Sequence, residues 1–151
     1  MTKNTWTLIA VAVVLAALYV FQFADLRGRP RIQINVSSRP FMPNAGPDDV
    51  LPILFGFDRD LAITALRVTP LSLLTNRTAG SPEPKPVWQL RAKAASEPVR
   101  GFRYGDPIGQ TEVVSGPEKL IPAIGYRLEI EAGKLQGSVD FVPQAALSPG
   151  N

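Results

Sequence analysis

Residues Tyr126–Val142 read YRLEIEAGKLQGSVDFV, two alternating runs on either side of a tight turn. In the first run Tyr126, Leu128 and Ile130 alternate with charged side chains, and this period of two is typical of a half-buried strand. The second run, after the turn at Ala132–Lys134, alternates in the same way. The whole stretch is therefore predicted to be a β-hairpin.

The same signals recur towards the N-terminus, where short apolar or alternating runs are separated by segments rich in Pro and Gly. Pro52 confines the run at 50–57 to an edge strand or a bulge. Residues 71–74 are expected to extend a strand past Pro70. Trp88 is expected in the core. Seven or eight short strands predict a mainly β fold, an antiparallel sandwich over residues 32–143. The further predicted strands are 32–36, 50–57, 61–68, 87–92, 99–104 and 111–114.

The segment Leu120–Ala132, LIPAIGYRLEIEA, resembles the corner found in fibronectin type III and other immunoglobulin-like domains. The resemblance implies that the Tyr126 ring packs inward, that its hydroxyl bonds upstream backbone, and that Leu120 and Pro122 shape the turn. It implies a structural or binding module and brings no catalytic residues with it. The two residues after Pro122 depart from the family pattern, which favours glycine and a small polar residue there.

The N-terminal region carries a long uncharged run, WTLIAVAVVLAALYVFQF, over Trp6–Phe23. As a helix these 18 residues would extend about 27 Å, close to the hydrocarbon thickness of a bilayer. We predict a transmembrane helix at 6–24 after a short flank at 1–5, with Trp6 and Tyr19 at the membrane interfaces. The run is longer than that of a cleaved signal peptide and lacks a small-residue cleavage site, which indicates a retained signal anchor.

A basic linker is predicted at 25–31, where Arg27, Arg29 and Arg31 would contact lipid phosphates. These arginines favour a cytoplasmic location for the residues that follow. A Cys-free, Pro-rich β domain behind an anchor is instead typical of bacterial envelope proteins. We expect a single-pass protein of the bacterial inner membrane with a periplasmic β domain, the cytoplasmic side remaining the alternative. A flexible tail is expected at 144–151.

The composition excludes several kinds of chemistry. The chain has no His and no Cys, which rules out thiol catalysis, Cys/His zinc sites and a Ser-His-Asp triad. Its net charge of +3 comes from scattered residues and argues against nucleic acid as a partner. The carboxylate pairs Asp58/Asp60 and Glu129/Glu131 are interpreted as solvated faces. No enzyme activity, metal site or cofactor is expected.

Arg100, Phe102, Arg103 and Tyr104 are the candidates for a partner interface, because Arg and aromatic residues are enriched at binding hot spots. The alternative is a strand whose aromatic residues are core and whose arginines are solvated. The expected function is a non-catalytic accessory subunit that stabilises a larger membrane complex, with other membrane protein subunits and the bilayer as partners. The alternative function is an anchored module that binds a peptide, a polysaccharide or an envelope protein.

Overall fold

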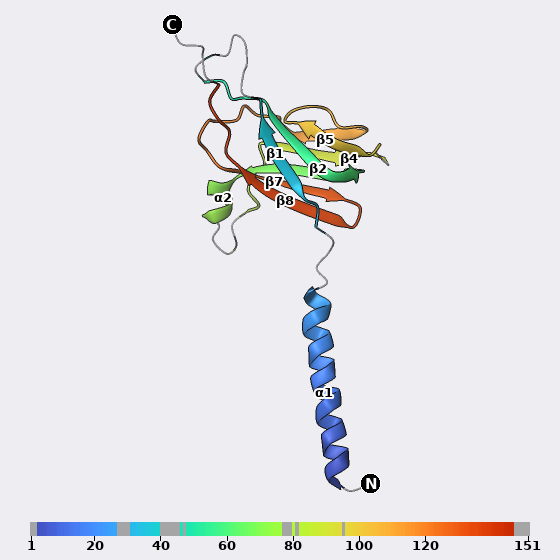
Figure 1. Ribbon diagram of the computed structural model, residues 1–151. Helices are drawn as coiled ribbons and strands as arrows, with labels where there is room; N and C mark the ends of the chain where they lie inside the picture. Colours follow the sequence, from blue (N-terminus) through green and yellow to red (C-terminus); the bar gives the residue numbers. More distant parts are fainter. Residues whose placement is uncertain are drawn as a thin grey trace. The chain divides into compact units, whose positions relative to one another are not determined.

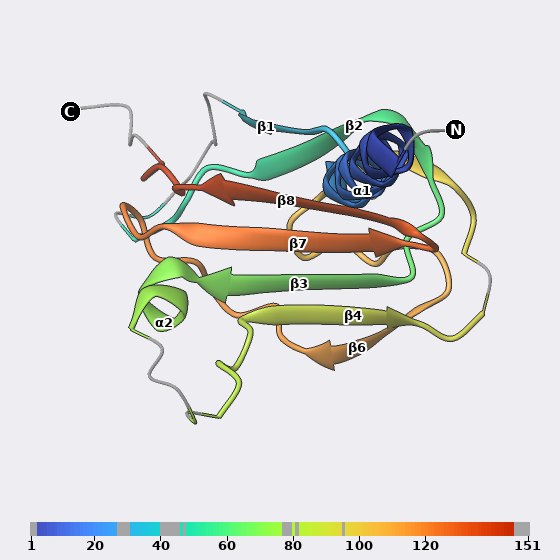
Figure 2. The ribbon, with the colours of Figure 1, turned by 90° about the horizontal axis from the view of Figure 1, so that it is seen from below.

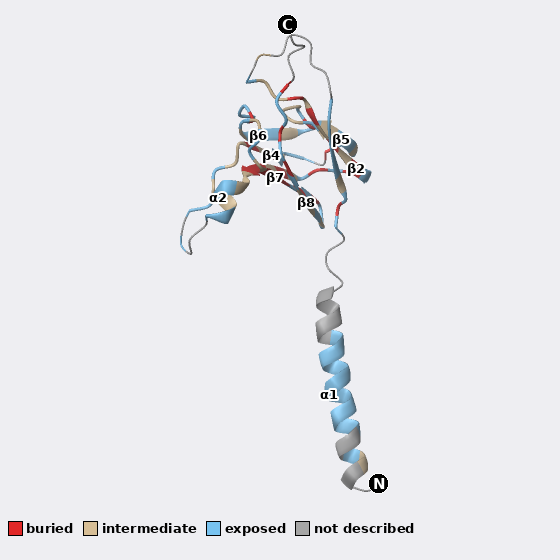
Figure 3. Cartoon of the chain, turned by 60° about the vertical axis from the view of Figure 1, so that its left-hand side comes forward, coloured by how far each residue is buried: buried red, intermediate tan, exposed pale blue. Residues whose placement is uncertain are grey.

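The structure is a computed structural model that describes residues 3–26, 31–39, 46, 48–76, 80, 82–94 and 96–146. The chain divides into two compact units, Met1–Arg31 and Ile32–Asn151. The first unit contains helix α1 (Lys3–Leu26), whose described side chains are nearly all exposed (Figures 1 and 3). Among the described residues no helix is long and apolar enough to cross a membrane. The helix includes the first two residues of the predicted linker.

The described part of the second unit forms eight strands and one short helix, and every strand pairing is antiparallel. The strands lie in a three-stranded sheet, β1-β2-β5, and a five-stranded sheet, β6-β4-β3-β7-β8 (Figure 2). The prediction of a mainly β fold with antiparallel sheets is confirmed. The elements are β1 (Ile34–Ser38), β2 (Ile53–Leu61), β3 (Ala65–Pro70), α2 (Leu71–Thr75), β4 (Trp88–Ala92), β5 (Val99–Arg103), β6 (Thr111–Ser115), β7 (Tyr126–Ala132) and β8 (Leu135–Phe141).

One face of each sheet is buried, as the alternation of the sequence requires. In β7 the apolar residues are buried while Glu129 and Glu131 are exposed. In β2 the residues Ile53, Phe55 and Phe57 are at most 6% exposed. Side chains on opposite strands continue these faces, so that both sheets contribute to a single hydrophobic core.

Aromatic rings join the two sheets across this core. The ring of Trp88 on β4 lies 5.8 Å from that of Phe102 on β5, and the ring of Phe55 on β2 lies 5.2 Å from that of Phe141 on β8. Trp88 is 1% exposed, as the sequence predicted for a core residue. Edge-to-face contacts of this kind add about 0.5–1.5 kcal/mol each beyond the buried area.

The strands β1 and β8 close one side of the domain. The backbone N–H of Ile32 donates to the carbonyl of Gln136 at 3.1 Å, which connects the two sheets. A Cβ atom at Gly137 would lie 2.8 Å from the Cβ of Ile32. The approach of β1 to β8 therefore requires a residue without a side chain at position 137.

Three local predictions differ from the structure. Residues 71–74 do not extend a strand, because the ladder of β3 ends at Pro70 and the Leu-rich segment behind it forms α2. Pro52 does not mark an edge strand: β2 begins one residue later and lies between β1 and β5. The predicted tail at 144–151 is held in its first residues, since Ala146 is buried and donates to Asp49. Residues 147–151 lie outside the described part.

The corner before β7 has the hydrogen bond that the resemblance implied. The backbone N–H of Ile121 donates to the hydroxyl of Tyr126 at 3.1 Å, and the Tyr126 ring is 2% exposed. Leu120 is buried and Pro122 is half-buried. Ala123 has a φ of 63° while its N–H donates to the carbonyl of Pro143. The departure from the family pattern thus falls on a residue in the left-handed region, where glycine is favoured.

We predict that Ala123→Gly stabilises the domain. The left-handed conformation costs an L-residue about 1–2 kcal/mol, and glycine costs about 0.5–1 kcal/mol in unfolded-state entropy, so the gain should be about 0.5–1 kcal/mol. Urea unfolding of the purified chain measures it. Ala62→Gly is the matched control, because Ala62 is exposed and has no positive φ; it should lose stability. Equal losses in both variants would contradict the prediction.

Candidate functional site

The described charged side chains of the second unit lie on its surface, and several of them pair with one another. The guanidinium of Arg59 holds the pKa of Asp58 below its usual range, and Arg127 does the same to the pKa of Asp140 through hydrogen bonds of 2.7 and 2.9 Å. Across the described residues, no three His, Cys, Asp or Glu side chains come together in a way that could hold a metal ion. Glu129 and Glu131 both point away from the core as solvated residues.

The four interface candidates do not form one patch. Phe102 is half-buried among the aromatic residues of the core, and Tyr104 stacks edge-on against Trp88 with ring centroids 4.9 Å apart. Arg100 is exposed. Arg103 is also exposed, and its guanidinium donates to a single carboxylate oxygen of Asp106. Of the four, only the side chain of Arg103 contributes a charge to the groove described next.

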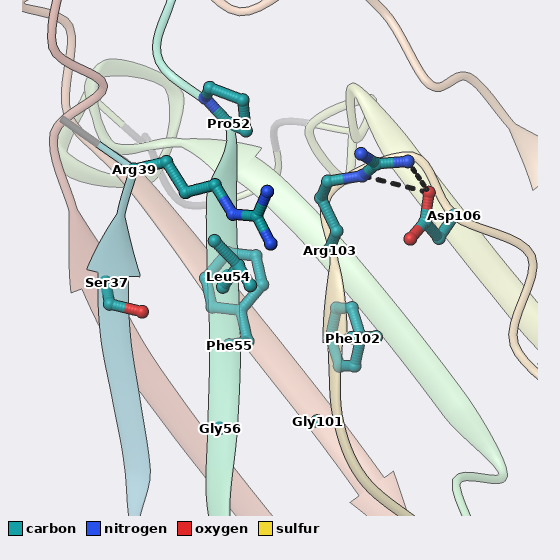
Figure 4. A pocket seen from close by; sticks show the side chains of 10 residues that line it. All are labelled: Ser37, Arg39, Pro52, Leu54, Phe55, Gly56, Gly101, Phe102, Arg103 and Asp106. Atoms are coloured by element: carbon teal, nitrogen blue, oxygen red, sulfur yellow. Dashed lines mark hydrogen bonds and ion pairs between the residues drawn. The ribbon is translucent and has the colours of Figure 1, made fainter. Parts of the chain in front are cut away.

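An open groove of about 660 Å³ lies on the face of the three-stranded sheet that points away from the core (Figure 4). Its walls come from β1, β2 and β5 and from the segments that flank them. The lining residues are Ser37, Arg39, Pro52, Leu54, Phe55, Gly56, Gly101, Phe102, Arg103 and Asp106.

Two facing glycines make the groove. Gly56 on β2 pairs with Gly101 on β5, and both occupy outward-facing positions because their neighbours Phe55 and Phe102 face the core. A Cβ atom at Gly101 would lie 2.5 Å from the carbonyl oxygen of Phe55, so glycine is required there. A Cβ atom at Gly56 would meet nothing within 4 Å, so that position opens into the groove.

The described side chains that line the groove carry a net positive charge. Arg39 extends across Leu54 towards β5, while the guanidinium of Arg103 turns to Asp106 (Figure 4). No salt bridge involves Arg39 within the described part of the chain. Sequence reasoning named Phe102 and Arg103 of this lining but not Arg39 or the two glycines. The available signal was a glycine inside each of two predicted strands, which often marks a close approach of another backbone or of a ligand.

The predicted membrane-interface residues divide between described and undescribed positions. Trp6 and Tyr19 are 69% and 62% exposed on α1. Arg31 is exposed, whereas Arg27 and Arg29 lie outside the described residues.

Comparison with known proteins finds no protein family, no curated protein and no solved structure that matches this chain. Any function must therefore be inferred from the arrangement of its own residues.

Tyr104 is held by both its ring and its hydroxyl. The ring packs on Trp88, and the hydroxyl donates to the carbonyl of Glu118 at 2.8 Å. Burial, with smaller contributions from the charges of Tyr126 and Glu118, raises the pKa of Tyr104 well above its usual value. Tyr104 is thus a fixed part of the domain.

We predict that Tyr104→Phe lowers stability at neutral pH by about 1 kcal/mol through loss of the hydrogen bond. The folded-state pKa of Tyr104 is raised, so its contribution is present below the unfolded pKa of about 10 and lost as pH rises through the folded value. The gap between wild type and variant should therefore narrow above about pH 10. Urea unfolding at pH 7, 9 and 11 measures this, and a constant gap would contradict it.

Proposed function

We propose that this chain is a single-pass, membrane-anchored, non-catalytic accessory subunit whose immunoglobulin-like β-sandwich stabilises a larger membrane protein complex. The observation that carries the proposal is the division into an apolar helical unit and a separate compact β domain, whose described residues bring no metal-binding cluster together. A compact domain of this kind offers surfaces for binding a partner.

The exposure of apolar side chains on α1 supports the membrane anchor. Val13, Leu15 and Val20 are 62%, 61% and 64% exposed, and their neighbours on every side of the helix are apolar too. Burying one such side chain gains about 1.5–3 kcal/mol, and an apolar circumference is typical of a helix surrounded by lipid or protein. The sequence carries no charged residue between Asn4 and Ala24, and an uncharged run of this length is typical of a helix that spans a bilayer.

The strand order supports the immunoglobulin-like assignment. Strands β1, β2 and β5 are neighbours as A, B and E are in that fold, and β3, β7 and β8 are neighbours as C, F and G are. Strands β4 and β6 extend the second sheet beyond β3. The Tyr126 hydroxyl bond at the start of β7 is in the position of a tyrosine corner.

Helix contacts with other subunits are supported by the small residues of α1. Ala10, Ala12, Ala16 and Ala17 are exposed, and small residues allow close approach of a neighbouring helix within a membrane. We propose that the protein lies in a bacterial inner membrane with its β domain on the periplasmic side, because that domain is Cys-free and Pro-rich.

A second candidate function, an anchored binding module, is favoured by the groove between Arg39 and Arg103. The two functions differ in what the helix does. Replacing Trp6–Phe23 by an unrelated apolar helix should weaken assembly of an accessory subunit. The same replacement should leave ligand binding by a module unchanged.

We predict that Val13→Arg combined with Val14→Arg removes the full-length chain from membranes. Each arginine at the centre of a spanning helix costs about 2.5–3.5 kcal/mol. Wild type should stay in the pellet after an alkaline carbonate wash, and the double variant should move largely to the supernatant. The matched control, Val13→Leu with Val14→Leu, should stay in the pellet. Recovery of wild type in the supernatant would contradict the anchor.

A further inference from the structure

We propose that the groove over Gly56 and Gly101 binds an extended segment of a partner protein through an acidic side chain that pairs with Arg39. The inference rests on the proposed function in one respect, that the β domain binds a partner, and it adds the chemistry of that partner. The groove shares Phe102 and Arg103 with the sequence-predicted interface residues and adds Arg39 and the two glycines.

The charge of the groove selects an acidic partner. Among the described residues, the ionisable ones that line it are Arg39, Arg103 and Asp106, and the last two neutralise each other at 2.9 Å. Arg39 remains as an exposed cation above the apolar surface of Leu54 (Figure 4). A guanidinium presents two parallel N–H donors to a carboxylate, and this geometry favours a bidentate pair.

The shape of the groove selects an extended segment. The floor is the outer face of β2 and β5, and the missing side chains at Gly56 and Gly101 expose backbone there. Ser37 on β1 adds a small polar side chain, while Pro52 and Leu54 supply apolar contact. An extended chain lying along the strands can fill such an open channel, place one carboxylate at Arg39 and rest its neighbouring side chains on Leu54.

The glycine pair also gives a means of closing the groove without disturbing the fold. Gly56→Phe places a ring over Gly101, where the structure shows open space next to Gly56. An aromatic residue beside a strand glycine is favourable in a sheet, so the variant should melt at or above the wild-type temperature. Gly101 cannot be used in this way, because a side chain there meets the backbone of Phe55.

The test uses the full-length chain in detergent micelles and a phage-displayed library of random dodecapeptides. The library is first depleted of phage that bind the Gly56→Phe variant. Selection on wild type should then enrich peptides that share an Asp or Glu. A selected peptide should bind Gly56→Phe at least tenfold more weakly than wild type. It should bind Arg39→Gln about five- to tenfold more weakly, the range expected for one charge-assisted pair.

Two controls isolate the ion pair. Arg100→Gln removes an exposed arginine of β5 that does not line the groove, and it should leave binding unchanged. Replacing the peptide's acid by its amide should weaken binding to wild type by the factor seen with Arg39→Gln. The amide peptide should then not distinguish wild type from Arg39→Gln.

Three outcomes of the peptide selection and binding measurements would overturn the proposal. These are no enrichment over Gly56→Phe, enriched peptides without a carboxylate, and equal losses in Arg39→Gln and Arg100→Gln. A dimer in sedimentation that Gly56→Phe dissociates, with no enriched peptide, would assign the groove to a second copy of the chain and also overturn it. The carbonate wash tests the membrane anchor separately. If the chain stays in washed membranes but binds no acidic peptide, the groove proposal is wrong and the anchor proposal stands.

Discussion

The packing of Trp88 against Phe102 and Tyr104 is the contact on which the β domain depends. Trp88 belongs to the five-stranded sheet, while Phe102 and Tyr104 come from β5 and the residue after it on the other sheet. Their rings hold the two sheets face to face. Because side chains alternate along a strand, burying Phe102 forces Gly101 and Arg103 to the opposite face.

The groove is therefore a consequence of the core. The register that pairs Phe55 with Phe102 inside the domain also pairs Gly56 with Gly101 outside it. A shift of one residue between β2 and β5 would separate both pairs at once. The stability of the core thus fixes the geometry of the surface that we propose for binding.

The sequence predicted most strands because local alternation carries the information. The hairpin was expected at 126–130 and 135–142, and it forms at 126–132 and 135–141. Residues 71–74 were wrongly predicted as a strand, because the strand pairing of β3 ends at Pro70. The end of a strand pairing is a tertiary effect that local propensity does not report. The groove as a whole was not predicted, because Arg39 and the two glycines are distant along the chain and meet on one face only in the folded domain. The interface candidates failed to converge because a strand sends neighbours to opposite faces.

The most direct measurement of the proposed role is affinity purification of the tagged, full-length chain from mildly solubilised native membranes, followed by native electrophoresis and mass spectrometry. We predict a single large species that contains this chain in fixed stoichiometry with other membrane proteins. Recovery of the chain as a lone monomer or a small homo-oligomer would contradict the accessory-subunit role.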